Sequence, residues 1–431
     1  MTRSIGANLF FAKGVFPLMG KFSPLAQAPR YLQSFHCVGS ACIENCCSGW
    51  QIGIDKPTFQ KYQAIKIEPL ASLVRQHVHK SSGSVSVGAS YATISLKTGQ
   101  ACPFLDEARL CQIHAGLGAQ ALSNTCKEYP RIYTLEGAHI GASASLSCPE
   151  AARLALATAD ALEMDVVTLP FANPSLVPFN RRSAPVGAGE PDLVRRHALV
   201  LREALMTVIK HPDLDASQAL VVCGLLLRQV AKVAAEAAEQ GADAGWADQG
   251  LSNAFGQYLN PDFLAQAGGH VRGLNISKEL QASLLVGATQ KFLDDHGGRE
   301  SFRELMAAVQ VGMQAGIALG ADRFSAFEAA HPHVLKNYLL NDLSTTLFSR
   351  VGMAALEADF MGLAVRFALM KFYLQALAAR PNCDFGLDEC VRVVYVVARN
   401  IEHNQRFMPM VLQSLKDNDA LRMEVLATLV G

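Results

Sequence analysis

Four cysteines fall within one short stretch near the start of this chain, FHCVGSACIENCCSGW (35–50), and four more follow before residue 150. Thiolates are soft, anionic ligands, and four of them in a tetrahedral arrangement satisfy either Zn²⁺ or the irons of an iron–sulfur cluster. The alternative interpretation is that they are small buried hydrophobes, because free cysteine is among the most buried residue types. Their clustering favours a metal centre. The candidate ligands are Cys37, Cys42, Cys46, Cys47, Cys102, Cys111, Cys126 and Cys148.

The spacing of these cysteines excludes two common motifs. The first four follow the pattern C-x4-C-x3-C-C, which is not the pattern of paired C-x2-C motifs in zinc ribbons. Gly49 stands where a cysteine would complete C-x3-C-x2-C after Cys42 and Cys46, so a radical enzyme of that type is disfavoured. Neighbouring side chains of an extended backbone face opposite ways, so we expect Cys46 and Cys47 not to bind the same metal ion. The sequence leaves open which four thiols are ligands, and whether there are one or two sites.

The remaining three cysteines lie outside this cluster. Cys223 stands alone in an apolar segment, and Cys383 and Cys390 flank the sequence DFGLDE. We expect all three to pack in the core, with pairing or ligation of the last two as the alternative.

Charge and length narrow the class of protein. The chain has 431 residues, of which 50% are hydrophobic, so it can bury a large core. Its 38 basic residues balance its 38 acidic ones, and no long run of like charge occurs. Nothing in this pattern indicates nucleic acid or an acidic membrane surface as a partner.

We expect a soluble, cytoplasmic protein. Lys13 interrupts the apolar N-terminal stretch, and no small-residue cleavage site follows it cleanly, as a secretion signal would require. The apolar run ALVVCGLLL (219–227) is far shorter than the ~20 residues that cross a bilayer, and Arg228 ends it. Cytosolic thiols are kept reduced, so dense cysteine indicates metal binding or catalysis rather than disulfides.

The predicted fold is mainly α, with a small cysteine-rich α+β region at the N-terminus. The sequences 85–97 and 131–148 have strand character, the latter as two strands about a turn at Glu136-Gly137. Apolar residues recur at helical spacing in 193–208, 219–238, 278–294, 301–319, 352–379 and 387–403. The expected organisation is an extension (1–28), a cysteine-rich region (29–165), a proline- and glycine-rich connector (166–192) and a helical domain (193–431).

Three cysteine-containing segments carry a resemblance to a known family. FHCVGSACIENCCSGWQIGIDKPTFQKY (35–62), CPFLDEARLCQIHAGLGAQALSNTCKEYPR (102–131) and LSCPEAARL (146–154) resemble the flagellin lysine N-methylases in order and spacing. Later segments, including NYLLNDLSTTLF (337–348) and VARNIEHNQRFM (397–408), resemble C-terminal segments of the same family. The cysteine-rich part is also similar to small proteins that chelate zinc or iron–sulfur clusters.

The resemblance implies an activity that the composition and spacing do not. It implies transfer of a methyl group from S-adenosylmethionine to lysine side chains of flagellin. It further implies a metal centre in the same polypeptide, of which an iron–sulfur cluster is the expected form and zinc the alternative.

Lysine methylation sets requirements for the residues of the site. The amine must be neutral, although free lysine has a pKa near ~10.4, so a desolvated channel and a group that accepts or orients the proton are needed. Candidates for this catalytic role are Tyr338, Glu402 and His403, with Tyr129 next to the cysteines. The plain alternatives are a core aromatic for Tyr338, a solvated helix face for Glu402, an ordinary hydrogen bond for His403 and a packing lid for Tyr129.

The binding site of the methyl donor is not identifiable from the sequence. The nearest glycine-rich match, VGAGEPD (186–192), does not follow a strand and is interpreted as a loop. The helical segments do not alternate with strands, so a doubly wound methyltransferase fold is not expected.

Two rival functions remain at this point. The first is a metal or iron–sulfur redox protein, in which the cluster itself is the function. The second is a zinc-stapled interaction module that binds flagellar proteins without chemistry.

Overall fold

The fold is described from a computed structural model of the chain. The described residues are 24–48, 52–81, 91–94, 96, 101–172, 177, 181–182, 192–240, 244–273, 278–345, 352–404, 406–417 and 423–430.

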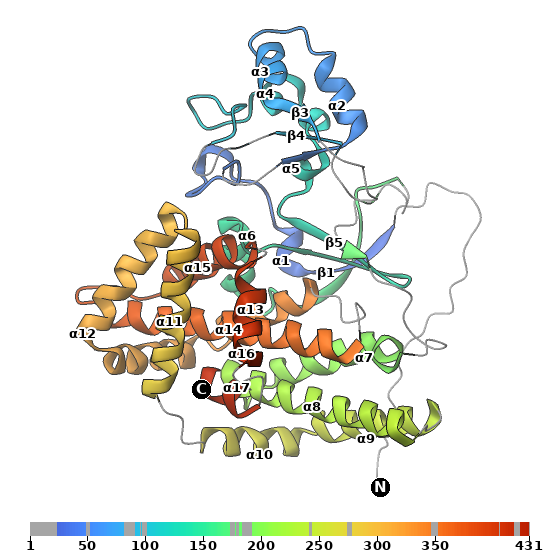
Figure 1. The fold of residues 1–431 in the computed structure, drawn as a ribbon, viewed down its shortest axis with the longest axis vertical. Coiled ribbons are helices and arrows are strands. Elements are labelled where there is room, and N and C mark those ends of the chain that lie inside the picture. Colours follow the sequence, from blue (N-terminus) through green and yellow to red (C-terminus); the bar gives the residue numbers. More distant parts are fainter. Residues whose placement is uncertain are drawn as a thin grey trace.

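Helices form the C-terminal part of the molecule (Figure 1). The helix predicted from the periodic residues Val194 to Val208 is α7, and these apolar residues are buried as the spacing requires. The helices of this part are α7 (Leu193–Lys210), α8 (Ala216–Gln240), α9 (Ala244–Tyr258), α10 (Pro261–Arg272), α11 (Lys278–His296), α12 (Glu300–Ala330), α13 (His333–Thr345), α14 (Gly352–Ala379), α15 (Leu387–Val397), α16 (Phe407–Asp417) and α17 (Met423–Val430). Each segment predicted from apolar periodicity contains a helix, but Gly316 interrupts the segment 301–319 with a non-helical conformation, and the segment 387–403 is α-helical only to Val397.

Helices α12 and α14 pack unusually closely. Gly312 and Gly320 lie on the face of α12 that meets α14, and a Cβ atom at either position would collide with a backbone carbonyl of α14, at Ala376 or Gln375. Glycine is therefore required here by the approach of two backbones rather than by a turn.

Two small sheets form the N-terminal part. The larger sheet has the order β7-β1-β6-β5-β8 and the smaller β2-β4-β3. Strands β5 and β6 pair in antiparallel fashion from Arg131↔Ala144 to Glu136↔His139, which confirms the predicted hairpin. The strands are β1 (Leu25–Pro29), β2 (Ile52–Ile54), β3 (Val78–Lys80), β4 (Ala92–Ile94), β5 (Arg131–Glu136), β6 (His139–Ala144), β7 (Met164–Thr168) and β8 (Arg181–Arg182). No doubly wound parallel sheet occurs among the described residues, in agreement with the predicted fold class.

Short helices complete the N-terminal part. Asp55 begins α2 as its N-cap, where its carboxylate accepts a hydrogen bond from the Thr58 backbone amide at 2.9 Å. The helices are α1 (Arg30–Gln33), α2 (Lys56–Gln63), α3 (Leu70–His77), α4 (Gln112–Leu117), α5 (Asn124–Glu128) and α6 (Pro149–Ala157), with 3₁₀ turns at Gly39–Ala41 and Ala119–Ala121. Of the predicted strand region 85–97, residues 85–90, 95 and 97 lie outside the described residues, and Ala92–Ile94 form β4.

The apolar cores do not follow the predicted regions one to one. A head core, built around Ile52, Ile54 and Phe104, belongs to the cysteine-rich region alone. Tyr31 and α6, which also come from that region, are buried in the same core as the C-terminal helices. The predicted connector begins inside β7 and includes β8, so parts of it are sheet. The division into domains remains a prediction.

Within the described part of the chain, two helices are long and apolar enough to cross a membrane by length and composition alone. One is Ala216–Glu239, whose most apolar window is 61% buried inside the protein, and the other is Glu300–Ala330, whose window is 22% buried. Buried core helices pass the same test, so this is weak evidence. The first helix continues through Arg228, in agreement with the predicted helical segment 219–238.

Candidate functional site

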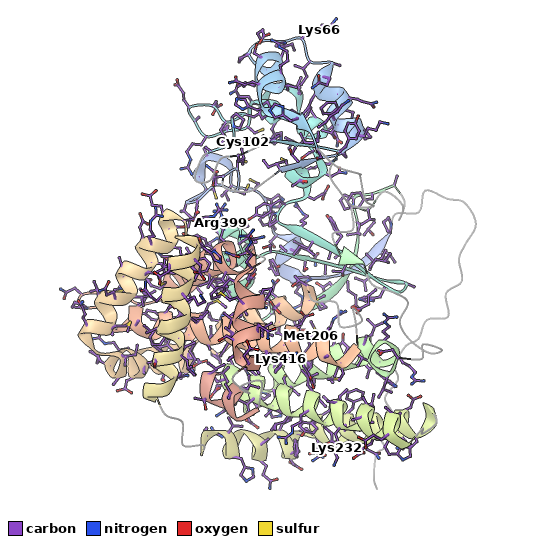
Figure 2. The ribbon with its side chains drawn as sticks, viewed as in Figure 1. Lys66, Cys102, Met206, Lys232, Arg399 and Lys416 are labelled. Atoms are coloured by element: carbon purple, nitrogen blue, oxygen red, sulfur yellow. The ribbon has the colours of Figure 1, made fainter. Side chains whose placement is uncertain are left out.

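Two arginines from the helical part hold the cysteine loop by its backbone. The buried Arg399 donates from Nη1 to the Glu44 carbonyl at 3.0 Å and from Nη2 to the Asn45 carbonyl at 2.6 Å. Arg299 donates to the Ser48 carbonyl at 2.9 Å. The loop that carries Cys46 and Cys47 is thus fixed on both sides by guanidinium groups. Figure 2 shows Arg399 where the cysteine-rich part meets the helices, with Cys102 further into the cysteine-rich part.

Arg399 is presented by an irregular turn. The residues Ala398–Glu402 form a π-helical turn that continues α15. Such turns are rare and frequently occur at functional sites. The amide oxygen of Asn400 in this turn accepts a hydrogen bond from the Arg299 backbone amide at 3.0 Å, which ties the start of α12 to the same place. One turn therefore positions both arginines.

The candidate thiols divide into two groups. Cys47, Cys102, Cys111 and Cys126 belong to the head core, where the Cys102 amide donates to the Cys47 carbonyl at 2.7 Å. Cys42 lies within electrostatic reach of Cys37, Cys46 and Cys148 on the side of Arg399. The thiols of Cys46 and Cys47 share a hydrogen bond at the boundary. This contact shows that the two side chains do not face opposite ways, and Cys46 also lies within electrostatic reach of Cys102 and Cys126. Whether Cys46 and Cys47 would bind different metal ions remains a prediction.

The environment sets the protonation of these thiols. The hydrogen bond with Cys47, and beyond it the positive charge of Arg399, lower the pKa of Cys46 to about 7. The same hydrogen bond, together with burial, raises the pKa of Cys47. Burial raises the pKa of Cys102 to about 11 and that of Cys148 to about 11. Among these four, Cys46 is the thiol most readily ionised.

No three Cys, His, Asp or Glu side chains within the described ranges converge closely enough to hold a metal ion as they stand. The predicted metal ligands are therefore neighbours without the geometry of a closed site. Their donor type fits zinc or iron–sulfur ligation, because thiolates suit both. The metal centre and its ligands remain a prediction.

The structure brings together two of the predicted catalytic residues in a buried polar cluster. The hydroxyl of Tyr338 donates to Oε1 of Glu402 at 3.2 Å. Arg366 pairs with Asp342 at 2.7 Å and lies 3.7 Å from the same Glu402 oxygen. Although burial opposes it, the carboxylate of Asp342 raises the pKa of Arg366 further above its usual range. Burial, and then the charge of Glu402, raise the pKa of Tyr338 well above 10.0, so its phenol stays protonated.

His403 and Tyr129 meet at a serine beside the thiols. Nε2 of His403 lies 2.9 Å from Oγ of Ser147, and the hydroxyl of Tyr129 lies 3.0 Å from the same oxygen. Ser145 also bonds to it at 2.7 Å. Ser147 directly precedes Cys148, the N-cap of α6. The side chains of Glu402 and His403, adjacent in sequence, thus connect the carboxylate cluster to the neighbourhood of Cys148.

Sequence reasoning missed several residues of this site. The arginines that hold the loop, the Arg366–Asp342 pair and Ser147 were not singled out. Arg399 lies within the segment 397–408 that carried part of the resemblance, three residues before Glu402, and this was the available signal. The glycine-rich stretch 186–191 lies outside the described residues.

The other cysteines mostly behave as expected. Cys223 and Cys390 are buried in the main core, as predicted. The sulfur of Cys383 accepts a hydrogen bond from Arg380 at 2.9 Å.

The architecture defines a class of protein in which a helical body is hydrogen-bonded to a thiol-rich head. Its described residues lack the doubly wound sheet of many nucleotide-binding enzymes. The family model for the FliB lysine N-methylase C-terminal domain matches residues 202–429, more than half of the chain, and the chain belongs to this family. That range contains Tyr338, Arg366, Arg399, Glu402 and His403.

Curated relatives agree with the family. A protein named lysine-N-methylase from Salmonella typhimurium is 36% identical over 142 residues, which are 33% of this chain and 35% of that protein. The same figures hold for the lysine-N-methylase of Salmonella choleraesuis. The flagellar biosynthetic protein FliU of Salmonella muenchen is 36% identical over 137 residues, which are 32% of this chain and 79% of that protein. The chain thus spans about a third of the length of the two lysine-N-methylases that it matches. No solved structure matches the chain.

Proposed function

We propose that this protein transfers methyl groups from S-adenosylmethionine to lysine side chains of flagellin in the cytoplasm. Family membership and the name lysine-N-methylase support the reaction, and the name flagellar biosynthetic protein supports the substrate. The observation that carries the proposal is the bond between Tyr338 and Glu402, within the family-matched region. It provides a partly exposed, oriented carboxylate that a substrate amine can reach.

The chemistry assigns a role to each group of this cluster. The neutral lysine nitrogen attacks the methyl carbon, the carbon–sulfur bond breaks, and S-adenosylhomocysteine leaves with the bonding electron pair. We assign Glu402 to accept the proton that the lysine ammonium must lose, since its side chain is 25% exposed and can be reached from outside. Tyr338 and Arg366 orient that carboxylate. His403, next in the chain, would orient the substrate near Ser147.

We also propose that the thiols of the head hold a metal centre, with an iron–sulfur cluster as the first form and zinc as the second. The clustering of eight thiols and the contact between Cys46 and Cys47 support it. When bound, a metal or cluster would tie the loops of the head together. Binding would deprotonate thiols such as Cys102 and Cys148 that burial keeps neutral, so metal affinity would rise with pH.

Co-expression with the flagellin of the same organism tests the proposal. Mass spectrometry of flagellin peptides is expected to show methylated lysines with the wild-type protein and none with Glu402→Gln. The double variant Cys46→Ala/Cys47→Ala tests whether methylation depends on the thiols of the head. Unmodified flagellin beside folded, metal-loaded protein would contradict the proposal. A reversible absorbance change on reduction would then favour the redox rival, and colourless, zinc-loaded protein that binds flagellin unchanged would favour the interaction module.

A further inference from the structure

A cavity of about 720 Å³ lies inside the helical body, where α8, α14, α16 and α17 meet. Its volume falls in the range of pockets that hold drug-sized ligands, roughly 300–1,000 Å³. It lies within the family-matched region. The functional site described above does not include it.

The lining of the cavity separates into an apolar floor and a polar rim. The floor is made of buried residues: Gly224, Leu227, Phe360, Met361 and Leu426. The rim is exposed and carries the side chains of Arg228, Glu357, Gln413 and Lys416. Figure 2 shows Lys416 near the middle of the helical body. A ligand that fits must bury a flat or apolar part and present both negative and positive groups to the rim.

One helix joins the cavity to the carboxylate cluster. Met361 of the floor and Arg366 are five residues apart on α14, so their backbones are separated by roughly 7.5 Å along the helix axis. Between them, a Cβ atom at Gly362 would lie 3.4 Å from Nη1 of Arg366 and 3.7 Å from Cε of Met408. Met408 precedes Pro409, which lines the cavity. A ligand in the cavity would therefore lie close to the group that contains Glu402.

We propose that this cavity binds the methyl donor, S-adenosylmethionine, an inference that rests on the proposed function. The flat adenine ring of the donor fits the apolar floor. Its ribose hydroxyls can donate hydrogen bonds to a carboxylate such as that of Glu357, and its own carboxylate can pair with Arg228 or Lys416. Methyl transfer needs donor and acceptor in line, and the short path along α14 provides that proximity.

Equilibrium dialysis with radiolabelled S-adenosylmethionine tests the proposal on the full-length, metal-loaded protein. Glu357→Gln is expected to weaken binding more than tenfold, and Ala358→Trp, which fills the cavity, to abolish it. Glu304→Gln, an exposed position on α12, is the matched control and is expected to leave binding unchanged. Circular dichroism melting curves show whether each variant folds, and Glu357→Gln keeps the test valid if the tryptophan variant does not.

The outcomes separate the cavity from the reaction. Binding that is equal in the wild type, Glu357→Gln and a folded Ala358→Trp protein would overturn the cavity as the donor site, as would folded wild-type protein that binds no donor. If the variants lose binding of S-adenosylmethionine as expected while the wild-type protein leaves flagellin unmethylated, the result supports the cavity as the donor site and contradicts the proposed function. If Ala358→Trp methylates flagellin as well as the wild type does, the function stands and the cavity falls.

Discussion

Arg399 donates a 2.6 Å hydrogen bond to the carbonyl of Asn45, across 354 residues of sequence. This contact ties the helical body to the loop that carries Cys46 and Cys47. Glu402 lies three residues after Arg399 in the same π-helical turn, so one turn carries both the contact to the cysteine loop and the proposed proton acceptor.

Replacement of Arg399 tests this connection. Arg399→Ala leaves the Glu44 carboxylate and two carbonyls without their cation, so the free energy of unfolding should fall by about 3 kcal/mol. Amide hydrogen exchange of residues 42–48 should rise sharply. Arg75→Ala breaks the exposed pair with Glu68 and serves as the control, with no measurable change expected. Unchanged amide hydrogen exchange of residues 42–48 in the Arg399 variant would show that the conformation of the loop does not depend on Arg399.

Tyr338→Phe separates positioning from stability. The lost hydrogen bond to Glu402 should cost about 1 kcal/mol of stability and lower the rate of methylation, because the carboxylate is less well oriented. Tyr373→Phe is a matched control, since that buried hydroxyl bonds to Thr289 at 2.6 Å. It should cost similar stability and leave methylation unchanged. Equal effects of the two substitutions on methylation would contradict the role given to Tyr338.

How much of this arrangement the sequence could reveal differs between residues. Six of the C-terminal helices, α7, α8, α11, α12, α14 and α15, followed from apolar periodicity, and the β5–β6 hairpin from its turn at Glu136-Gly137. The contact between the thiols of Cys46 and Cys47 did not follow from side-chain alternation, which placed the two side chains on opposite sides. The bond of Tyr338 with Glu402, and the hold of Arg399 on the cysteine loop, depend on how distant segments pack, and no local spacing encodes that. The role of Arg366 could not be predicted from the sequence, because a single arginine in an apolar helix gives no spacing pattern from which its ion-pair partner can be inferred.

The pKa of Cys46 can be read from alkylation. In metal-free protein, reaction of Cys46 with iodoacetamide should reach half its maximal rate near pH 7, because only the thiolate reacts and its pKa is lowered to about 7. Cys148, whose pKa is raised to about 11, should react only in alkaline solution. Peptide mass spectrometry after short exposures at each pH gives both profiles. Half-maximal reaction of Cys46 at pH 9 or above would refute the stabilising role of Cys47 and Arg399.

Replacement of glycine by alanine is expected to change the free energy of unfolding in opposite directions at two positions. Gly320→Ala drives a methyl group into the backbone of α14 and should lower the free energy of unfolding by about 3 kcal/mol. Gly287→Ala in α11 meets nothing within 4 Å and should raise it by about 0.5–1 kcal/mol, because alanine is the better helix former. Urea denaturation measures both. A neutral Gly320 variant would mean that α12 and α14 can separate at little cost.

The central claim is that this protein moves a methyl group from S-adenosylmethionine to flagellin lysine, with Glu402 as the proton acceptor. The most direct measurement incubates purified, metal-loaded protein with flagellin and S-adenosylmethionine that carries an isotopically labelled methyl group. We predict labelled methyl groups on flagellin lysines with the wild type, and a loss of at least a hundredfold in rate with Glu402→Gln. Flagellin that acquires no label from folded wild-type protein, or equal labelling by the Glu402 variant, would contradict the account.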